Sequence, residues 1–557
     1  MNYLGLGKTK HNSSICLIQG ANIELLLTER FNKIKNSGAW PSESLNLIKP
    51  QIDIQNTQIA ENRDVIKAKS IEAFMDLQFP FFDFLKKNKL DQFSSHFNLN
   101  IENVGHHLAH AYAVLAMSPF YKSIIVVMDG AGSQLSNEDE NEKTFEECSV
   151  YLQDGVDLKL VYATSVQFKP SPNHEHQTFS DTIGFSYEKI SEFIFNTPHS
   201  SGKVMGLAPF GVPSKIEDLN YFLEKLPWAN SFKGKGKAEW EKNCGDLYKD
   251  LSASIQRKFE ETYDILLDML RIKYPDYENL ILTGGCALNC TNNARIFYQN
   301  KFNQVYIPPF PGDESIGFGL AHFLKFKKNP SLWEICKMSE QSAYFGFSKS
   351  APTDLDVIKT FSNDKYEIRK SNNISKEVAE LLYQNNIIAW FQGRSETGPR
   401  ALGNRSILAN PLFLNLKKFL NDHVKFRENF RPYGCSVIQD KAHIYFNVPE
   451  NFDNPYMSYA LKVREPFKES LKEVSHIDGT SRMQTVRISQ NKKFYELIEA
   501  FGNLSNMYCL LNTSLNVMEE PILETIVDAK IFMDRSVLQY IVINDFIIIN
   551  KAWNKNV

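Results

Sequence analysis

The sequence has no excess of charge of one sign and no long hydrophobic run. Its 557 residues carry 62 basic and 65 acidic side chains, a net charge of −3, so no overall field attracts a nucleic acid or an anionic membrane. An apolar stretch such as residues 540–550 is interrupted by Asn544 and Asp545 and is well short of the ~20 residues that a membrane-spanning helix needs. We therefore expect neither a nucleic-acid partner nor a membrane partner.

Signals for a secretory leader and for a disulfide or zinc framework are also missing, so neither feature is expected. Residues 1–8 contain no basic region followed by an apolar core, which predicts a cytoplasmic protein. Eight cysteines are scattered along the chain, and only Cys286 and Cys290 lie close together, without a second pair. Reduced and buried thiols are expected instead.

What is present is a chain large enough for two or three buried cores. Hydrophobic residues make up 43% of the sequence and the mean hydropathy is −0.33, as expected for a soluble, globular, multidomain protein. Residues 330–373 are polar and irregular, which places a domain junction there. A predicted helix at 375–382 and a strand at 387–391 follow, as in an α/β fold.

A pattern of three strands occurs twice. The predicted strands are 3–7, 14–19 and 23–29 in the first copy, and 123–133, 148–152 and 158–164 in the second. In both copies a polar loop joins the first two strands and a tight turn joins the last two. Such a duplication suits a two-lobed nucleotide site, in which backbone N–H groups of each lobe bind a phosphate. Residues 202–206 and 280–285 are predicted as further glycine turns, the second before a helix at 292–299.

Two histidines one helical turn apart form a candidate metal site. His106 and His110 leave the same face of a helix and can chelate one ion, although histidines at this spacing are also common in cores and caps. The zincin motif needs Glu where this chain has His107, so a metalloprotease is disfavoured. Asp129 follows an apolar strand and Asp313 lies in a polar loop, both at the edge of an expected cleft. Two histidines and two aspartates suit Fe(II), Mn(II) or Zn(II).

Basic residues cluster in the C-terminal part, within residues 393–405, 424–432 and 478–484. Arginine forks beside glycine turns bind phosphate oxygens with several donors, so these segments predict a phosphate or anhydride site. His11 lies in a polar loop, where it is either a solvated turn residue or, if the loop lines the nucleotide cleft, a base for an acceptor hydroxyl.

Seven motifs, in order over nearly the whole chain, resemble the O-carbamoyltransferases of the nodulation, cephamycin and tobramycin type. They are residues 8–11 (KTKH), 29–31 (ERF), 106–110 (HHLAH), 202–211 (GKVMGLAPFG), 284–289 (GGCALN), 398–406 (GPRALGNRS) and 511–516 (LNTSLN). Several of them are six to ten residues long, which makes a chance match a poor explanation.

The resemblance implies a duplicated TsaD-like domain of the actin-type ATPase superfamily at 1–345, a linker at 346–372 and an α/β YrdC-like domain at 373–557. It implies that the YrdC-like domain makes carbamoyl adenylate from carbamoyl phosphate and ATP, with magnesium. The TsaD-like domain then transfers the carbamoyl group to a hydroxyl of a small molecule, such as a natural product, toxin or sugar, and the two sites share an interior cavity.

The resemblance also implies roles for individual residues. The metal ligands, with Fe(II) as the expected ion, are His106, His110, Asp129 and Asp313, and His11 lies at the transfer centre. The expected nucleotide-binding residues are Gly130, Gly132, Lys203, Gly284, Gly285 and Asn289. The residues expected to bind carbamoyl phosphate or its adenylate are Lys35, Arg394, Arg427, Arg431, Arg482, Asn512, Ser514 and Asn516.

The chain departs from the family pattern after Asn516. The family continues with Val, a basic residue, Gly, Glu and Pro, whereas this chain reads Val-Met-Glu-Glu-Pro. Met518 thus replaces a basic residue and Glu519 replaces a glycine near the expected anion site. Either Arg405 or Lys425 compensates, or the affinity of that site has changed.

Two alternative functions are less favoured. One is a regulatory or scaffold protein that has kept ATP binding and lost turnover, for which the altered turn is the sole support. The other is threonylcarbamoyl transfer to tRNA, which is disfavoured because the chain has no basic stripe. The identity of the acceptor is expected to depend on loops within 36–92 and 212–243, and the protein is expected to be a monomer or a homodimer.

Overall fold

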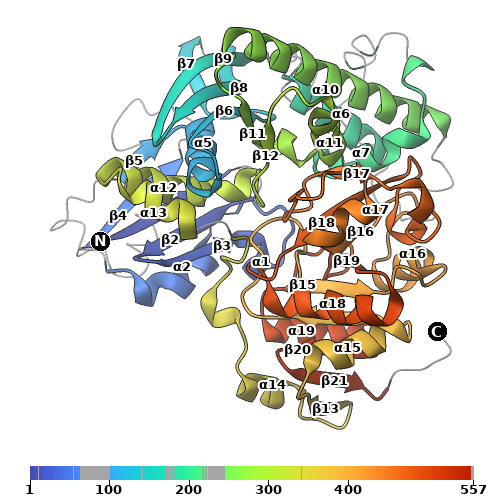
Figure 1. The fold of residues 1–557 in the computed structure, drawn as a ribbon. Helices are drawn as coiled ribbons and strands as arrows, with labels where there is room; N and C mark the ends of the chain where they lie inside the picture. Colours follow the sequence, from blue (N-terminus) through green and yellow to red (C-terminus); the bar gives the residue numbers. More distant parts are fainter. Residues whose placement is uncertain are drawn as a thin grey trace. The chain divides into compact units, whose positions relative to one another are not determined.

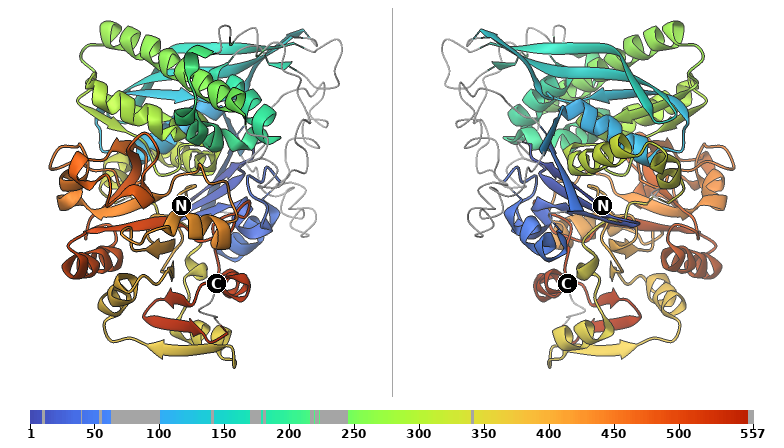
Figure 2. Two further views of the ribbon diagram at one scale, coloured as in Figure 1. Left: turned by 90° about the vertical axis from the view of Figure 1, so that its right-hand side faces the viewer. Right: turned by 90° about the vertical axis from the view of Figure 1, so that its left-hand side faces the viewer.

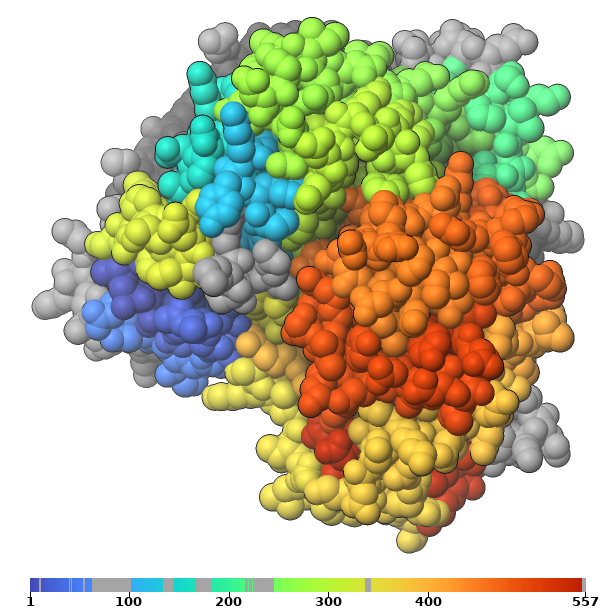
Figure 3. All heavy atoms as spheres, in the orientation of Figure 1, coloured from blue at the N-terminus to red at the C-terminus, as the bar shows by residue number. Residues whose placement is uncertain are grey.

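A computed structural model describes most of the chain, and the described residues are coloured from blue to red in Figure 3. They are 1–9, 12–39, 41–53, 56–62, 101–139, 142–169, 178–179, 182–215, 219, 223, 245–339 and 342–552. His11 and most of 36–92 and 212–243 lie outside them. No helix in these ranges is long and apolar enough to cross a membrane.

The described residues form two compact units. The first comprises Met1–Ser186, Ile265–Leu288 and Lys301–Ser342, and the second comprises Tyr187–Asp264, Asn289–Asn300 and Ala343–Val557. The chain therefore passes between the units more than once. The predicted domain boundaries, which follow the sequence continuously, stay a prediction.

Two sheets make up most of the first unit (Figure 1). The strands of one sheet are β1 (Asn2–Gly7), β2 (Ser14–Gln19), β3 (Asn22–Leu27), β4 (Thr57–Asn62) and β5 (Ile101–Val104). Those of the other are β6 (Lys122–Met128), β7 (Gln134–Asp139), β8 (Glu142–Asp154), β9 (Asp157–Lys169), β10 (Thr178–Phe179), β11 (Asn279–Thr283) and β12 (Gln304–Tyr306).

The two sheets repeat one strand order. The first runs β3-β2-β1-β4-β5 and the second contains β9-β8-β6-β11-β12, with β10 beyond β9 and β7 paired to β8. In each sheet the first three strands are antiparallel neighbours and the last two join in parallel. Figure 2 shows β8 and β9 as a long hairpin. This topology confirms the predicted duplication of strands.

Helices follow or cover these strands. In the first unit they are α1 (Thr28–Asn32), α2 (Ser42–Ile48), α5 (His106–Met117), α12 (Ile316–Lys328) and α13 (Leu332–Ser339). The middle of the chain forms α6 (Ile183–Phe195), α7 (Ser201–Leu207), α10 (Asp246–Lys273) and α11 (Cys290–Gln299). Helix α11 confirms the helix predicted at 292–299. Residues 202–206, however, belong to α7, so the predicted glycine turn is wrong there, because packing around this segment outweighs the low helix propensity of glycine.

The second unit is built on one nine-stranded mixed sheet, in the order β13-β21-β20-β14-β15-β19-β16-β18-β17. Its strands are β13 (Tyr366–Lys370), β14 (Ile388–Phe391), β15 (Arg405–Ala409), β16 (Gly434–Ile438), β17 (Ala460–Lys462), β18 (Thr480–Val486), β19 (Cys509–Ser514), β20 (Tyr540–Ile543) and β21 (Phe546–Asn550). Its helices include α14 (Asp354–Phe361), α15 (Ile374–Tyr383), α16 (Leu416–Phe419), α17 (Ala442–Tyr445), α18 (Lys492–Ser505) and α19 (Ile526–Arg535).

Local sequence explains several of these elements. Thr353 and Thr525 form capping boxes at the starts of α14 and α19, and the side chain of Asn373 caps α15. Helix α15 and strand β14 confirm the α/β pattern predicted from residue 375 onward. The segment expected as a linker, residues 346–372, contains α14 and the edge strand β13, whose exposed polar face gives it an irregular sequence.

Candidate metal centre and anion site

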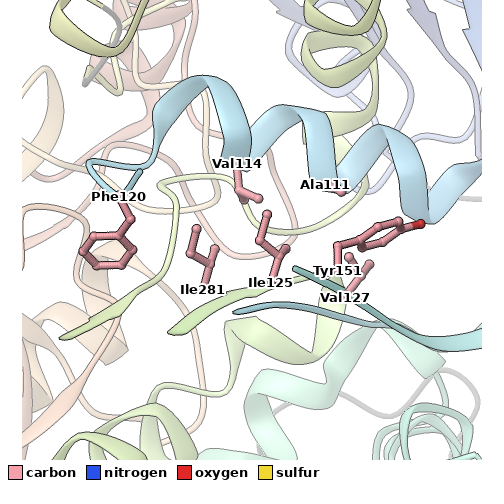
Figure 4. Close-up of a cluster of buried hydrophobic side chains, with 7 residues drawn as sticks. All are labelled: Ala111, Val114, Phe120, Ile125, Val127, Tyr151 and Ile281. Atoms are coloured by element: carbon pink, nitrogen blue, oxygen red, sulfur yellow. The ribbon is translucent and has the colours of Figure 1, made fainter. Parts of the chain in front are cut away.

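Helix α5 is fixed to the second sheet of the first unit by a buried hydrophobic cluster (Figure 4). Ala111 and Val114 of the helix pack against side chains of the sheet, which include Ile125 and Val127 of β6 and Ile281 of β11. Burial of this many apolar side chains stabilises the contact by several kcal/mol at about 1.5–3 kcal/mol each. The helix that carries the two histidines is therefore held against the strand that leads into Asp129.

The first turn of α5 is held by side chains from outside the helix. The backbone N–H of His106 donates to Ser133 Oγ at 2.8 Å, and that of His107 donates to a carboxylate oxygen of Glu146 at 3.3 Å. The same Glu146 oxygen accepts from the N–H of Ser133 at 2.9 Å. These contacts satisfy backbone N–H groups that have no partner within the helix. They also fix the position of the first turn, from which the side chain of His106 extends.

Asp313 is far from α5 in the sequence and lies at the start of a short helical turn before α12. Helix α12 approaches α5 closely, since a Cβ on Gly319 would lie 1.9 Å from the carbonyl oxygen of Ala109. Only glycine allows this approach. The close packing of the two helices brings Asp313 next to His106 and His110.

The four predicted metal ligands lie together and are buried. One donor atom from each of His106, His110, Asp129 and Asp313 lies within 4.8 Å of the others. The two Nε2 atoms are 3.2 Å apart, and they lie 3.5 and 3.4 Å from Asp129 Oδ2. Their distances to Asp313 Oδ1 are 3.4 and 3.7 Å.

This geometry fits a first-row metal ion. Bonds of roughly 2.0–2.2 Å to four tetrahedral ligands separate neighbouring donors by about 3.3–3.6 Å. The five separations that involve a histidine nitrogen, 3.2 to 3.7 Å, lie within about 0.1 Å of that range. Asp129 Oδ2 is also buried and accepts no hydrogen bond within the described part of the chain, although its other oxygen accepts from the N–H of Gly130. A buried carboxylate oxygen of this kind is expected where a cation binds.

The charges of the four side chains also favour a bound cation. Burial lowers the pKa of His106 and His110, but Asp129 and Asp313 outweigh it and raise the pKa of both imidazoles. Burial and the charge of Asp313 raise the pKa of Asp129, and the two histidines, whose Nε2 atoms lie 3.5 and 3.4 Å from its Oδ2, outweigh this and lower the pKa below its ordinary value. Two carboxylates buried this closely need nearby positive charge, which protons or a divalent ion can supply.

His107 is not part of the cluster. Burial and the neighbouring His106 lower its pKa to about 3, so it is neutral at pH 7. Its Nδ1 is 2.8 Å from Ser149 Oγ. Of the three histidines, His106 and His110 are thus the two that lie together with Asp129 and Asp313.

Ser315 orients His110, a contact that the sequence analysis missed. Its hydroxyl lies 3.0 Å from His110 Nδ1, and the side chain is fully buried. We expect Ser315→Ala to weaken metal retention about 10- to 100-fold, because the imidazole loses the partner that fixes its tautomer and rotation. Competition with a chelator measures this. Ser123→Ala, which removes a buried hydroxyl at the far end of β6, should retain the metal of the wild type, and equal loss in both variants would contradict the role of Ser315.

Four of the six predicted nucleotide-binding residues lie beside Asp129. Gly130 donates to Asp129 Oδ1 at 2.8 Å, and Gly132 follows it in the same loop. A Cβ on Gly285 would lie 3.0 Å from the same carboxylate. Gly284 has a φ of +86°, and a Cβ there would meet the carbonyl oxygen of Met128 at 2.3 Å, so this turn requires glycine. The two loops meet because β6 and β11 are parallel neighbours.

The other two lie in the second unit. Asn289 caps α11 by accepting from the N–H of Asn292 at 3.0 Å, and its Nδ2 donates to Gln256 Oε1 at 2.9 Å. Lys203 Nζ lies 3.0 Å from Glu428 Oε1. These contacts of the two side chains are with residues of the second unit.

Three of the predicted anion-binding residues form a cationic group, which we call the arginine cluster: Arg427, Arg431 and Arg482. Burial and the charges of Arg431 and Arg482 lower the pKa of Arg427 to about 10. Arg427 lies over the ring of Tyr433 at 4.0 Å and donates from Nε to Asn421 Oδ1 at 3.0 Å. Nε of Arg482 is buried and donates to no residue that the structure describes. An unsatisfied guanidinium donor beside two like charges is suited to an anion.

The other predicted members of this site have partners in the protein. Arg394 donates from Nε to the carbonyl oxygen of Gly346 at 2.7 Å and from Nη2 to that of Phe345 at 2.8 Å. Asn512 is buried and donates to Ser436 Oγ at 2.9 Å. Lys35 is exposed in the turn after α1.

Ser514 and Asn516 surround a lysine. Lys425 Nζ donates to the carbonyl oxygens of both residues, at 2.6 and 2.9 Å, and to Asn516 Oδ1 at 2.6 Å. Arg405 is fully buried and donates to four main-chain carbonyl oxygens, including that of Glu524 at 3.2 Å. Of the two basic residues that could compensate for the altered turn, Lys425 contacts Asn516, the residue directly before it.

The altered turn keeps the backbone conformation of a glycine. Glu519 is exposed and has a φ of +65°, in the left-handed region that disfavours side chains. We expect Glu519→Gly to raise the free energy of unfolding by about 0.5–1 kcal/mol, because relief of this strain exceeds the entropy that glycine adds to the unfolded chain. The urea midpoint measures it. Glu496→Gly, within α18, should instead lower stability by about 1 kcal/mol, and a loss of stability in both variants would contradict the prediction.

A duplicated α/β unit with a buried His2Asp2 set, together with a second unit that holds one buried and two partly buried arginines side by side, is typical of an enzyme rather than a purely structural protein. Residues 84–322 match the model of the carbamoyltransferase N-terminus, and residues 379–550 match that of the carbamoyltransferase C-terminus.

Known proteins resemble the chain over most of its length. Nodulation protein NolNO of Sinorhizobium fredii is 28% identical over 98% of this chain and 80% of its own length. Nodulation protein NolO of Bradyrhizobium diazoefficiens is 30% identical over 80% of this chain and 78% of its own length. The 3'-hydroxymethylcephem-O-carbamoyltransferase of Amycolatopsis lactamdurans is 29% identical over 62% of this chain and 64% of its own length. The chain belongs to the carbamoyltransferase family, and it is a carbamoyltransferase.

Proposed function

We propose that this enzyme is an ATP-dependent O-carbamoyltransferase that acts on a small molecule. Its arginine cluster would serve the formation of carbamoyl adenylate from carbamoyl phosphate and ATP, and the His2Asp2 cluster would serve transfer to an acceptor hydroxyl. The observation that carries the proposal is the presence of two different sites in one chain, one with four converging metal-ligand side chains and one with an unsatisfied buried arginine donor. Relatives include an enzyme named for O-carbamoylation of a hydroxymethylcephem.

The architecture proposed for this function is a TsaD-like domain at 1–345, a linker at 346–372 and a YrdC-like domain at 373–557. The repeated strand order of the first unit supports the first part of this assignment. The nine-stranded α/β sheet of the second unit supports the last part.

His106, His110, Asp129 and Asp313 would hold the metal, which we propose to be Fe(II) or another divalent first-row ion, since nitrogen and carboxylate donors suit such ions. When bound, the ion supplies positive charge that stabilises anionic oxygens during transfer. The glycine loops at 130–132 and 284–285 lie beside these ligands, and the small residues would let phosphate oxygens come close. The N–H groups of Gly130, Gly132 and Gly284 themselves donate within the protein, to Asp129 Oδ1 and to the carbonyl oxygens of Glu146 and Pro311. His11 is the proposed base, which would take the proton of the acceptor hydroxyl.

The chemistry at the arginine cluster follows from charge. Carbamoyl phosphate yields phosphate and carbamate on reaction with water, and a carbamate oxygen then bonds to the α-phosphorus of ATP as pyrophosphate leaves. Arg427, Arg431 and Arg482 would bind and orient the phosphate oxygens throughout. In the second reaction the acceptor oxygen bonds to the carbamoyl carbon, and AMP leaves.

Purified full-length protein tests the proposal directly. With ATP, magnesium and carbamoyl phosphate it should release pyrophosphate, and none should appear without carbamoyl phosphate. With an acceptor, drawn from metabolites made by enzymes encoded next to this one, AMP should appear together with a product whose mass has gained one carbamoyl group in place of a proton. A protein without catalytic turnover would release no pyrophosphate even with Fe(II) added, and that result would refute the proposal.

A further inference from the structure

Lys203 contacts the arginine-bearing loop of the second unit. Its ammonium is 3.0 Å from Glu428 Oε1 and lies over the ring of Phe195 at 5.3 Å. The side chain of Lys203 is 17% exposed, and that of Glu428 is 7% exposed. An ion pair this sheltered is screened far less than one at the surface. Glu428 lies between Arg427 and Arg431 in the sequence, so this contact joins Lys203 to the arginine cluster.

The helix that carries Lys203 is docked by several other contacts. The carbonyl oxygen of Gly206 accepts from His476 Nε2 at 2.8 Å, and the ring of His476 packs edge-on against Phe210 at 5.5 Å. Phe195 stacks on Phe430 with ring centroids 6.2 Å apart. Apolar, aromatic and hydrogen-bonding contacts thus hold the segment in place, so the ion pair of Lys203 is not an isolated surface contact.

Glu428 is shared between two cations. Its Oε1 faces Lys203, and its Oε2 lies 3.6 Å from Arg431 Nη1. Burial raises the pKa of Glu428, but Lys203 and Arg431 outweigh it and lower the pKa, so the side chain is ionised. The Oε2 atom is buried and accepts no hydrogen bond from the described residues, which leaves Arg431 as its electrostatic partner.

The pairing of Glu428 with both Lys203 and Arg431 balances charge around the arginine cluster. Arg427, Arg431 and Arg482 repel one another, and a carboxylate among them reduces the repulsion. That same carboxylate would repel an incoming phosphate and compete with it for Arg431. A second cation on its far side cancels the unwanted charge while leaving the carboxylate in place to orient Arg431.

We infer that Lys203 is a positioning residue of the anion site: through Glu428 it orients Arg431, and it neutralises the Glu428 carboxylate beside the arginine cluster. The family resemblance assigned Lys203 to nucleotide binding, and its contact with Glu428 connects it to the arginine cluster. The inference rests on the proposed function only in that the cluster binds a phosphate-type anion.

Binding of inorganic phosphate to the full-length protein, measured by calorimetry, tests the inference with three variants. Lys203→Met should weaken phosphate binding about tenfold, because an uncompensated buried carboxylate then faces the anion. Lys203→Arg should stay within about threefold of the wild type, because the charge is kept. The double variant Lys203→Met with Glu428→Gln should recover most of the loss, because a neutral amide needs no counter-ion. In turnover, Lys203→Met should raise KM for carbamoyl phosphate much more than it lowers kcat.

The possible outcomes separate the inference from the function on which it rests. Phosphate binding that is unchanged in Lys203→Met, or weakened equally in the single and double variants, overturns the inference, since a direct ligand cannot be rescued through Glu428. If the wild type and Lys203→Met both bind no phosphate, the proposed anion site is itself refuted and the inference falls with it. A loss in the single variant that the double variant recovers supports both.

Discussion

Asp313→Asn is expected to abolish metal retention and to reduce carbamoyl transfer at least about 1000-fold. Asp313 Oδ1 lies 3.4 and 3.7 Å from the Nε2 atoms of the two histidines, so it faces the position that an ion would occupy. An amide has the same shape but no charge. The variant leaves a single carboxylate, Asp129, to balance a divalent ion in a buried site.

Elemental analysis of protein purified without chelator, together with the rate of product formation, measures this effect. The wild type should contain about one ion per chain, since four ligands form one site. His107→Asn is the matched control, because His107 is buried on the same helix and its amide replacement can keep the contact to Ser149. The control should retain the metal. Wild-type metal content in Asp313→Asn would show that Asp313 is not a ligand of the ion.

Arg482→Met should lower carbamoyl-phosphate-dependent pyrophosphate release about 100-fold and leave the metal content unchanged. Arg482 holds a buried Nε without a hydrogen-bond acceptor among the described residues, and its charge adds to those of Arg427 and Arg431. A hydrogen bond to a charged group contributes about 1.5–3 kcal/mol, and a bidentate arginine makes two. Methionine keeps the apolar stem and removes both the donors and the charge.

The control for this variant lies on the same stretch of chain. Arg487 follows β18, is 35% exposed, and pairs with Asp453 at 3.2 Å. Arg487→Met should therefore keep near-normal pyrophosphate release. If both variants lose activity equally, the effect is on the stability of β18, and if neither loses activity, the arginine cluster does not bind the reacting phosphates.

The sequence predicted much of the local structure because its signals are short in range. Alternation of apolar residues and the positions of tight turns gave the three-strand pattern twice, and both copies are present in the structure. The i, i+4 spacing predicted that His106 and His110 share a helix face, and their Nε2 atoms lie 3.2 Å apart. These features depend on residues that are neighbours in the chain.

Contacts over long separations were harder to predict. Glycine-rich residues 202–206 were expected as a turn, yet they form part of helix α7, because its packing on the segment of Phe430 and His476 outweighs local propensity. The pairing of Lys203 with Glu428 joins residues 225 positions apart and has no local signal. Because Ser315 stands two residues after Asp313, a place near the metal site could have been suspected from the sequence. Its contact with His110, 205 residues away in the chain, could not.

By itself the sequence determined the α/β class, the duplicated strands and the residue types of the two sites, because periodicity, turn chemistry and ligand chemistry are properties of short segments. Tertiary structure decided which side chains meet. Asp313 reaches the histidines because α12 packs closely on α5 at Gly319. Lys203 joins the arginines because aromatic contacts of Phe195 and Phe210, on either side of α7, hold this segment in place. Such long-range contacts depend on how side chains pack across the whole fold, and a local pattern of residues does not determine that packing.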